Sequence, residues 1–145
     1  MYLGLGTNLG NREANLRKAI QLIGERVGQV IRQSSFIETD PWGFQSDNRF
    51  MNAVILVGTE MTPRQVLETT QQIERDMGRQ KKSVDGHYSD RVIDIDILLF
   101  DTEKVNEPDL KIPHPRMLER PFVMIPLAEI SQRDQEQTIN EIKTS

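Results

Sequence analysis

The chain has 145 residues, of which 37% are hydrophobic and 28% charged, and its formal net charge at pH 7 is −4. It contains no cysteine, which excludes disulfides, thiolate metal sites and thiol catalysis, and its net negative charge argues against non-specific binding of nucleic acid. No apolar run is long enough to span a membrane and the N-terminal segment lacks the basic region of a signal peptide, so we expect a single cytoplasmic domain over residues 1–145.

The first two predicted elements are a strand and an amphipathic helix. Residues 2–6 form a short apolar strand that leads into Gly-Thr-Asn, and Asn8 or Asn11 can cap the helix that follows. From Arg12 to Val27 apolar residues recur at helical spacing, and Gly28 ends the pattern.

Two strands and a second helix come next. Residues 30–39 alternate loosely and residues 50–57 are apolar, so both segments predict strands. The segment between them, residues 40–49, is rich in turn formers and predicts a long loop, a kind of segment that often carries function. Thr62 is the predicted N-cap of a helix over residues 63–77, whose first residue is proline.

A polar, basic loop at residues 80–90 leads to the most informative segment, a predicted strand over residues 92–100. Alternation places Asp94 and Asp96 side by side on one face of this strand. The other face carries only apolar side chains, namely Ile93, Ile95, Ile97 and Leu99. Two close carboxylates repel each other unless a cation lies between them, and Mg²⁺ is commonly held by one or two carboxylates plus substrate phosphates. The pair therefore indicates metal-assisted phosphate chemistry.

The alternative is a solvated strand face, because Asp-x-Asp alone is a weak motif. Basic residues near the strand favour the metal site, and they are Arg79, Lys81, Lys82, Arg91, His114, Arg116 and Arg120. Such cations suit a polyanion that also carries metal. No Walker A motif is present, so phosphate binding would come from side chains and metal.

The predicted order β-α-β-β-α-β indicates an α+β fold of the ferredoxin-like type, with a four-stranded antiparallel sheet, both helices on one face and a C-terminal extension. The isoleucine face of the last strand would lie under the helices, and the two aspartates would point to the open face or its rim. The predicted core spans residues 2–130, and a polar tail follows over residues 131–145.

Four segments, in this order and spacing, extend from residue 3 to about residue 130. They are Gly4–Gly10; Thr39–Gly43 with Phe50–Asn52; Glu74–Arg79 with Arg91–Leu98; and Ile112–Arg116 with Arg120–Val123. Together they resemble the family of 6-hydroxymethyl-7,8-dihydropterin pyrophosphokinases, enzymes of folate biosynthesis. The resemblance implies the ferredoxin-like fold and transfer of the pyrophosphoryl group of ATP to the hydroxymethyl group of the pterin, with release of AMP.

The resemblance also implies roles for individual residues. Asp94 and Asp96 would hold two Mg²⁺ ions that bridge the ATP phosphates, and Asp96 is a candidate for the general base. The catalytic set, including the cationic clamp on the phosphates, would be Arg79, Arg91, Asp94, Asp96, His114 and Arg120. The pterin-binding set would be Thr39, Pro41, Trp42, Phe50, Asn52 and Phe122, with the two phenylalanines stacking on the pterin. The ATP-binding set would be Leu67, Gln71, Glu74, Tyr88, Ile97, Leu110 and Ile112.

Several of these residues have plain structural alternatives. Phe50 could be a core residue at the start of a strand, His114 a surface histidine on a proline-rich turn, and Glu74 a structural carboxylate. The chain also departs from the family pattern at two places. Tyr88-Ser89-Asp90 stands where the family usually has Trp-Gly-Pro, and Asp109 stands where a basic residue is common.

Two other function classes remain as alternatives to the pyrophosphokinase. A ferredoxin-like nucleic-acid module or metal-dependent nuclease could use the same aspartates, but only 6% of the residues are aromatic and the net charge is negative. A catalytically inactive scaffold would be expected to lack one of the aspartates or clamp residues. We therefore expect a monomer that binds ATP and the dihydropterin as small-molecule substrates, with no nucleic-acid or membrane partner.

Overall fold

The computed structural model describes residues 1–39, 49–78, 92–101 and 103–131. Its main sheet is antiparallel, with the strand order β2-β4-β1-β5, and a short strand β3 pairs with β4 beyond the end of β2. The strands are β1 (Tyr2–Thr7), β2 (Gln29–Gln33), β3 (Ile37–Thr39), β4 (Phe50–Gly58) and β5 (Asp94–Leu99). β2 and β3 together correspond to the second strand of the predicted β-α-β-β-α-β unit, and β4 corresponds to the third. The order confirms the predicted ferredoxin-like class, because the first and third strands of that unit, β1 and β4, lie side by side at the centre of the sheet.

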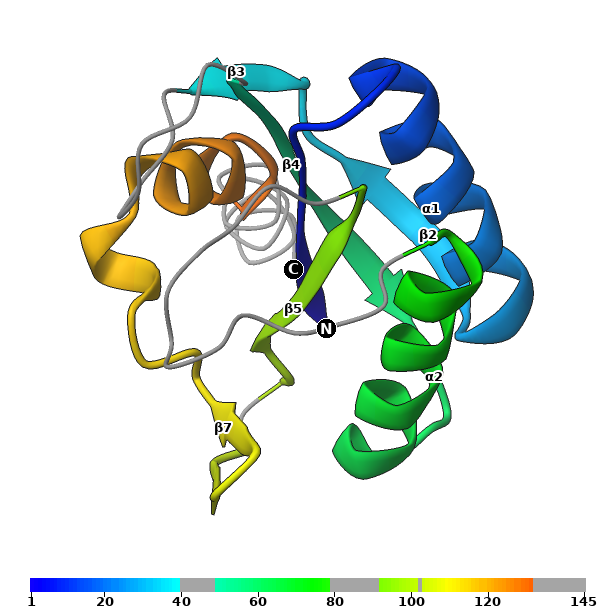
Figure 1. The fold of residues 1–145 in the computed structure, drawn as a ribbon. Helices are drawn as coiled ribbons and strands as arrows, with labels where there is room; N and C mark the ends of the chain where they lie inside the picture. The colour runs from blue at the N-terminus through cyan, green and yellow to red at the C-terminus, as the bar shows by residue number, and fades with distance from the viewer. Residues whose placement is uncertain (40–48, 79–91, 102, 132–145) are drawn as a thin grey trace, which may run out of the picture.

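Two helices cover one face of this sheet (Figure 1). In α1 (Arg12–Arg26) the side chain of Asn11 caps the N-terminus by accepting a 3.1 Å hydrogen bond from the amide of Ala14. In α2 (Pro63–Asp76) Thr62 and Gln65 form a reciprocal capping box. Both helices therefore begin where the sequence predicts.

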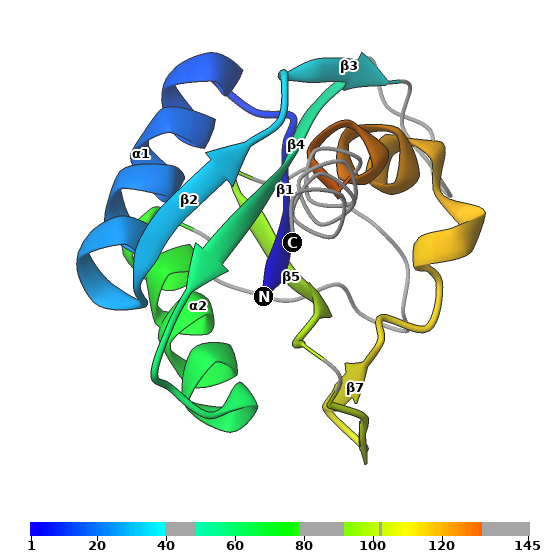
Figure 2. The same cartoon turned by 180° about the vertical axis from the view of Figure 1, so that it is seen from behind.

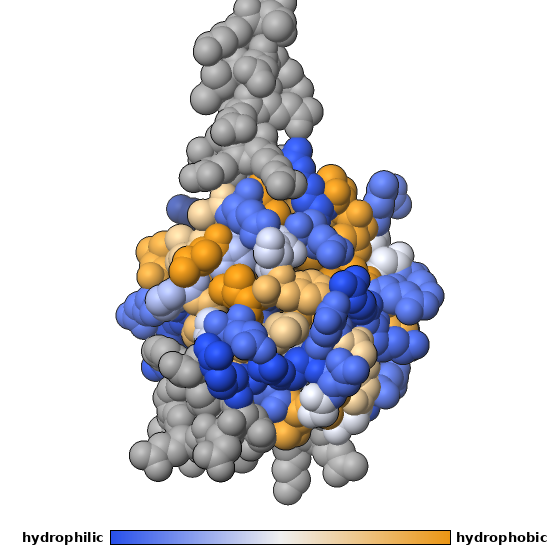
Figure 3. Space-filling model, turned by 90° about the horizontal axis from the view of Figure 1, so that it is seen from above, coloured by the Kyte–Doolittle hydropathy of each residue, from blue (hydrophilic) through white to orange (hydrophobic). Residues whose placement is uncertain are grey.

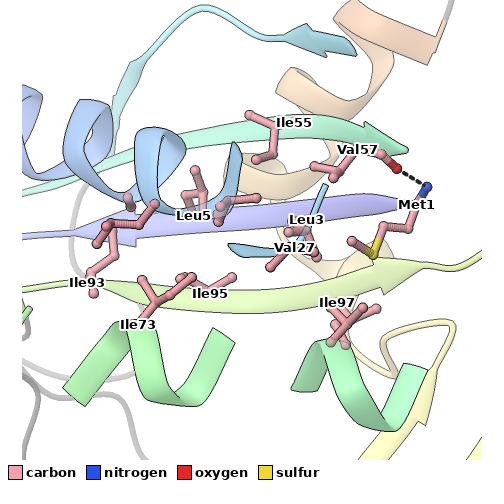
Figure 4. Packing of buried hydrophobic residues seen from close by; sticks show 14 of the residues in the cluster. Met1, Leu3, Leu5, Val27, Ile55, Val57, Ile73, Ile93, Ile95 and Ile97 are labelled. Atoms are coloured by element: carbon pink, nitrogen blue, oxygen red, sulfur yellow. Dashed lines mark hydrogen bonds between the residues drawn. The ribbon is translucent and has the colours of Figure 1, made fainter. Parts of the chain in front are cut away.

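The main hydrophobic core lies between these helices and the sheet. Figure 4 shows Leu3 and Leu5 of β1 with Ile55 and Val57 of β4 in this layer, and the terminal amino group of Met1 donates a 2.8 Å hydrogen bond to the carbonyl of Val57. The isoleucines Ile93, Ile95 and Ile97 belong to the same cluster, as predicted.

The opposite face of the sheet, predicted to be open, is partly covered. A 3₁₀ helix η2 (Met117–Glu119) and a helix over residues 121–131 lie across this face (Figure 2). Their buried residues pack on the strands in a second cluster of Val54, Leu98, Met117, Val123, Leu127 and Ile130. The spacing of the last three residues is helical, but prolines among residues 113–126 obscure it in the sequence.

Leu99 was predicted on the isoleucine face, and that prediction is wrong. The pairing of β5 with β1 shifts register between Tyr2 and Leu3, so Tyr2 lies opposite Leu99 while Leu3 lies opposite Ile97. This bulge interrupts the alternation at Leu98, and Leu99 packs against the second cluster instead.

The predicted strand over residues 30–39 is two strands, β2 and β3. Between them the hydroxyl of Ser34 accepts a 2.9 Å hydrogen bond from the amide of Val54, while the amide of Ser34 donates to the carbonyl of Val54. The side chain thus takes a place that a backbone carbonyl would hold in a continuous strand, and the chain bends there.

A small hairpin of β6 (Val105–Glu107) and β7 (Leu110–Ile112) follows β5 and was not predicted. Arg64 at the start of α2 holds it. Its guanidinium donates to both carboxylate oxygens of Asp109, at 2.7 and 2.9 Å, and also pairs with Glu107. These bonds raise the pKa of Arg64 further above its usual range. Asp109, a departure from the family pattern, is therefore a partner of α2.

Apart from Arg49 and residue 131, the predicted loops at 40–49 and 80–90 and the tail at 131–145 lie outside the described residues. Within the described part of the chain, no helix has the length and apolar character needed to cross a bilayer. Large exposed hydrophobic side chains are few there, namely Ile31, Leu118 and Ile125. On the face seen in Figure 3, hydrophobic patches alternate with hydrophilic ones.

Candidate active site

A pocket opens on the face of the sheet that carries η2 and the helix over residues 121–131. The empty space within it and at its mouth, which is open to solvent, amounts to about 500 Å³. Its lining comes from three strands, the end of β3 and the C-terminal segment, and consists of Gly4, Leu5, Gly6, Thr39, Phe50, Asn52, Ala53, Asp94, Asp96, Arg120, Phe122 and Val123. The predicted aspartates and the predicted pterin-binding residues of the described chain therefore meet in one cavity.

The floor of this pocket follows from strand register. Gly6 of β1 lies opposite Asn52 on one side and Asp94 on the other, and Gly4 lies opposite Asp96. A β-carbon at Gly6 would lie 3.0 Å from the side-chain oxygen of Asn52, so glycine leaves the space between the amide and Asp94 open. In the sequence these glycines stand out only as part of a motif, and their place opposite the aspartates depends on the strand pairing.

Phe50, Asn52 and Thr39 form the end of the pocket near the β3–β4 ladder. The amide of Asn52, a buried side chain, donates a 2.8 Å hydrogen bond to the hydroxyl of Thr39. Phe50 is buried but belongs to neither apolar cluster of the described residues, which disfavours the simple core alternative. Phe122, in the first turn of the helix over residues 121–131, supplies the second aromatic ring.

Arg120 brings a buried cation to the same pocket. Only 4% of the residue is exposed, and burial lowers the pKa of its guanidinium, which still remains protonated at neutral pH. The guanidinium carbon lies 5.8 Å from the centroid of the Phe122 ring, a cation–π distance. Arg120 therefore lines the same cavity as the two aspartates and lies within cation–π distance of one of its aromatic rings.

His114 is held close to Asp94 by its backbone and ring. Its amide donates a 3.0 Å hydrogen bond to the carbonyl of Leu98, and its Nδ1 accepts a 3.3 Å bond from the amide of Arg116. Burial lowers the pKa of the imidazole, the negative charge of Asp94 opposes this shift, and Arg116 adds to it. A neutral ring whose Nδ1 accepts carries its proton on Nε2, so His114 can donate from that atom. It is half-buried, which disfavours the surface alternative.

The donor set of the pocket fits Mg²⁺ with phosphate better than a metal held by protein alone. Asp94 and Asp96 are half-buried and line the same cavity. Among the described residues no group of three or more histidines, aspartates or glutamates could hold a metal ion. Two carboxylates suit Mg²⁺, which keeps several waters or substrate oxygens, and would not make a closed zinc site.

The predicted nucleotide-binding residues lie on the other side of β5. Leu67, Ile97, Leu110 and Ile112 all pack in the main core cluster, and Gln71 is half-buried on α2. Ile97 faces the helices, whereas the aspartates face the pocket. A single ligand would therefore have to pass over the edge of β5 to contact both the predicted nucleotide-binding residues and the aspartates. The carboxylate of Glu74 bonds to the backbone of β5, and its contact with nucleotide stays a prediction.

Several predicted residues fall outside the described part of the chain. They are Arg79 and Arg91 of the phosphate clamp, Pro41 and Trp42 of the pterin set, and Tyr88 of the ATP set. Conversely, the pocket contains Leu5, Ala53 and Val123, to which the sequence analysis gave no binding role. In the sequence these residues are marked only by the periodic spacing of apolar side chains, which core residues show equally well.

Comparison with known proteins agrees with this geometry. Residues 2–132 match the family model described as 7,8-dihydro-6-hydroxymethylpterin-pyrophosphokinase. Over 132 residues the chain is 47% identical to a 2-amino-4-hydroxy-6-hydroxymethyldihydropteridine pyrophosphokinase of Porphyromonas gingivalis, covering 90% of each chain. It is 42% identical to the Bacillus subtilis protein of the same name over 91% of this chain and 78% of the relative. It is also 37% identical to an Arabidopsis thaliana folate synthesis bifunctional protein over 90% of this chain and 26% of the relative. With the pocket, the aspartate pair and these relatives in agreement, the chain belongs to the 7,8-dihydro-6-hydroxymethylpterin-pyrophosphokinase family.

Proposed function

We propose that this chain transfers the pyrophosphoryl group of ATP to the hydroxyl of 6-hydroxymethyl-7,8-dihydropterin, giving the pterin diphosphate and AMP for folate biosynthesis. The observation that carries the proposal is one pocket in which two aromatic rings and a buried amide adjoin a pair of carboxylates. The rings and the amide suit a flat heterocycle, and the carboxylates suit metal-bound phosphate.

The aromatic end would bind the pterin. Phe50 and Phe122 supply rings for stacking, and Asn52 has both a donor and an acceptor for the amide edge of the heterocycle. The hydrogen bond from Asn52 to Thr39 fixes the orientation of the side-chain amide before substrate arrives. A preorganised amide loses little freedom on binding and selects a ligand with the matching edge.

The acidic end would bind two Mg²⁺ ions through Asp94 and Asp96. Bound there, the ions would neutralise the phosphates and align the attacking hydroxyl with the β-phosphorus. Around them Arg120 offers a permanent positive charge, and His114 offers a neutral N–H donor near Asp94. Both groups can stabilise the negative charge that develops on the leaving AMP by electrostatic attraction and hydrogen bonding, without transferring a proton to it. Asp96 remains our candidate for the base that accepts the hydroxyl proton.

ATP would cross the outer edge of β5, with which no described strand pairs. Its adenine would lie near α2 and β7, on the side of Leu67, Leu110 and Ile112, and its phosphates would reach the aspartates on the opposite side. This path explains why the predicted nucleotide-binding residues pack on the helical side of the sheet whereas the predicted metal ligands line the pocket on the other side. The aromatic end of the pocket stays free for the second substrate.

A product assay tests the proposal directly. The protein is incubated with ATP and Mg²⁺, with and without 6-hydroxymethyl-7,8-dihydropterin, and nucleotide products are separated by chromatography. We expect AMP only when the pterin is present, in equal amount to pterin diphosphate. Formation of ADP, or AMP formation that does not depend on the pterin, would contradict the proposed reaction.

A further inference from the structure

Glu74, a member of the predicted ATP-binding set, is a buried carboxylate of α2 that contacts the backbone of β5. It is 4% exposed and lies on the face of α2 that also buries Val66, Thr70 and Ile73. An ionised carboxylate in such a place costs free energy unless hydrogen bonds replace its lost water. Oε2 of Glu74 accepts a 3.0 Å hydrogen bond from the amide of Ile95 in β5. Helix α2 thereby makes a charge-assisted bond to the backbone of this strand.

The bonded strand is an edge strand. In the described sheet β5 pairs with β1 on one side, and no described strand pairs with its other side. The amide groups on the outer side of an edge strand lack a strand partner, and their backbone is less constrained than that of a central strand. The carboxylate of Glu74 supplies an acceptor that a neighbouring strand would otherwise provide.

The position of the bond is its most informative property. Ile95 stands between Asp94 and Asp96, and the peptide group whose N–H is bonded joins Asp94 to Ile95. Ile95 packs toward the helices, whereas both aspartates line the pocket. Glu74 itself is absent from the pocket lining. It therefore holds the strand from behind, at the residue that links the two carboxylates.

We propose that Glu74 is a positioning residue, which fixes the Asp94–Ile95 peptide and so keeps the two aspartates in the geometry that binds divalent metal with nucleotide phosphates. This inference rests on the proposed function, because it assumes that the aspartates hold metal. Groups that orient metal ligands typically contribute about 10–100-fold to metal affinity. A loss at the lower end of this range is expected here, since Glu74 acts on the backbone and not on the ligating side chains.

The experiment uses variants that separate the hydrogen bond from the charge. Glu74→Met removes both while keeping the length of the side chain, Glu74→Gln keeps an acceptor oxygen without the charge, and Glu74→Asp keeps the charge but withdraws it by one methylene. Thr70→Val is the matched control. Thr70 is buried one turn earlier on the same helix face, and its hydroxyl donates to the carbonyl of Leu67 within the helix.

Two readouts besides activity are measured on the full chain. Mn²⁺ affinity is determined by electron paramagnetic resonance in the presence of α,β-methylene ATP, whose bridging carbon prevents pyrophosphoryl transfer. Amide hydrogen exchange of Ile95 is followed in the metal-free protein. We expect Glu74→Met and Glu74→Asp to weaken Mn²⁺ binding about tenfold and to speed exchange at Ile95. Glu74→Gln should restore most of both properties, and Thr70→Val should match the wild type.

Each contrary result has its own meaning. Wild-type Mn²⁺ affinity in folded Glu74→Asp or Glu74→Met would overturn the role of Glu74. Glu74→Gln behaving like Glu74→Met would show that the buried charge, and not the bond to Ile95, sets metal affinity. An Asp96→Asn variant serves as reference: if it binds Mn²⁺ like the wild type, the proposed metal site fails and the positioning role fails with it. If only Asp96→Asn loses the metal, the proposed site stands and the positioning role alone is refuted.

Discussion

The two faces of the sheet are formed by the same strands but differ in role. On the face under α1 and α2, alternate residues of these strands pack in a closed hydrophobic core, among them Leu3 and Leu5 of β1, Ile55 and Val57 of β4, and Ile95 and Ile97 of β5. On the other face the alternate positions carry glycine, asparagine and aspartate at one end and apolar residues under the C-terminal helix at the other. The two-residue period of a strand therefore separates the side chains that stabilise the fold from the side chains proposed for the chemistry, so neighbours in sequence have unrelated roles.

The largest effect is expected from the acidic pair. Asp96→Ala removes a proposed metal ligand from a half-buried position in the pocket, so pyrophosphoryl transfer should be abolished while thermal stability stays near that of the wild type. AMP formation and the melting temperature test this. Asp101→Asn is the control, because Asp101 is exposed just after β5 and its φ of 50° suits asparagine. Wild-type turnover by Asp96→Ala would show that the proposed metal site is wrong.

A substitution on the helical face should have the converse effect. Ile55 is fully buried in β4 and belongs to the core under the helices. Ile55→Ala should lower the free energy of unfolding by about 2–5 kcal/mol, the usual cost of a cavity left by a buried aliphatic side chain. Urea denaturation measures this. Below the unfolding transition kcat/KM should be unchanged, and a specific loss of activity in the folded variant would mean that the two faces are not independent.

A smaller effect is expected at the aromatic end of the pocket. Phe122→Ala should weaken pterin binding by about 1–3 kcal/mol, the scale of lost stacking and burial. Fluorescence titration or calorimetry with the pterin measures the change. Leu118→Ala is the control, since Leu118 is 80% exposed in the preceding 3₁₀ helix. Equal pterin affinity in Phe122→Ala and the wild type would remove this ring from the site.

The smallest effect concerns pH. Because burial lowers the pKa of His114, the unfolded chain binds a proton at mildly acidic pH that the folded imidazole does not bind. The contribution of His114 to stability is therefore complete above the ordinary histidine pKa of about 6.5 and falls as the pH decreases below it. Urea denaturation at a series of pH values should show a shallower pH dependence for His114→Gln. An unchanged slope would contradict a neutral, buried His114.

The sequence predicted most of the described elements before residue 100 because local signals there agree with the tertiary structure. Asn11 and Thr62 cap the helices as expected, and strand alternation placed the isoleucines and aspartates on opposite faces. Leu99 failed because a bulge depends on the partner strand, which a single segment does not encode. The helix over residues 121–131 was missed because prolines within and before it obscure an apolar pattern that tertiary packing completes.

The candidate site could be predicted from the sequence only in part. Its aspartates stood out because charge in an apolar strand is costly, and the family resemblance supplied Phe50, Asn52 and Phe122. The use of Gly4 and Gly6 as the pocket floor could not be predicted, since it depends on which residues of β4 and β5 lie opposite them. The bond from Glu74 to Ile95 depends likewise on how closely α2 packs on the strand.

The ion pairs of Arg64 link the choice of residue at position 64 to the choice at position 109. Because the guanidinium of Arg64 bonds both oxygens of Asp109, a change of Asp109 alone to the basic residue common in the family would set two cations against each other. A joint exchange of the two charges, or a neutral residue at one of the two positions, would avoid this repulsion. We therefore expect that related sequences with an acidic residue at this position of the hairpin carry a basic residue at the start of α2.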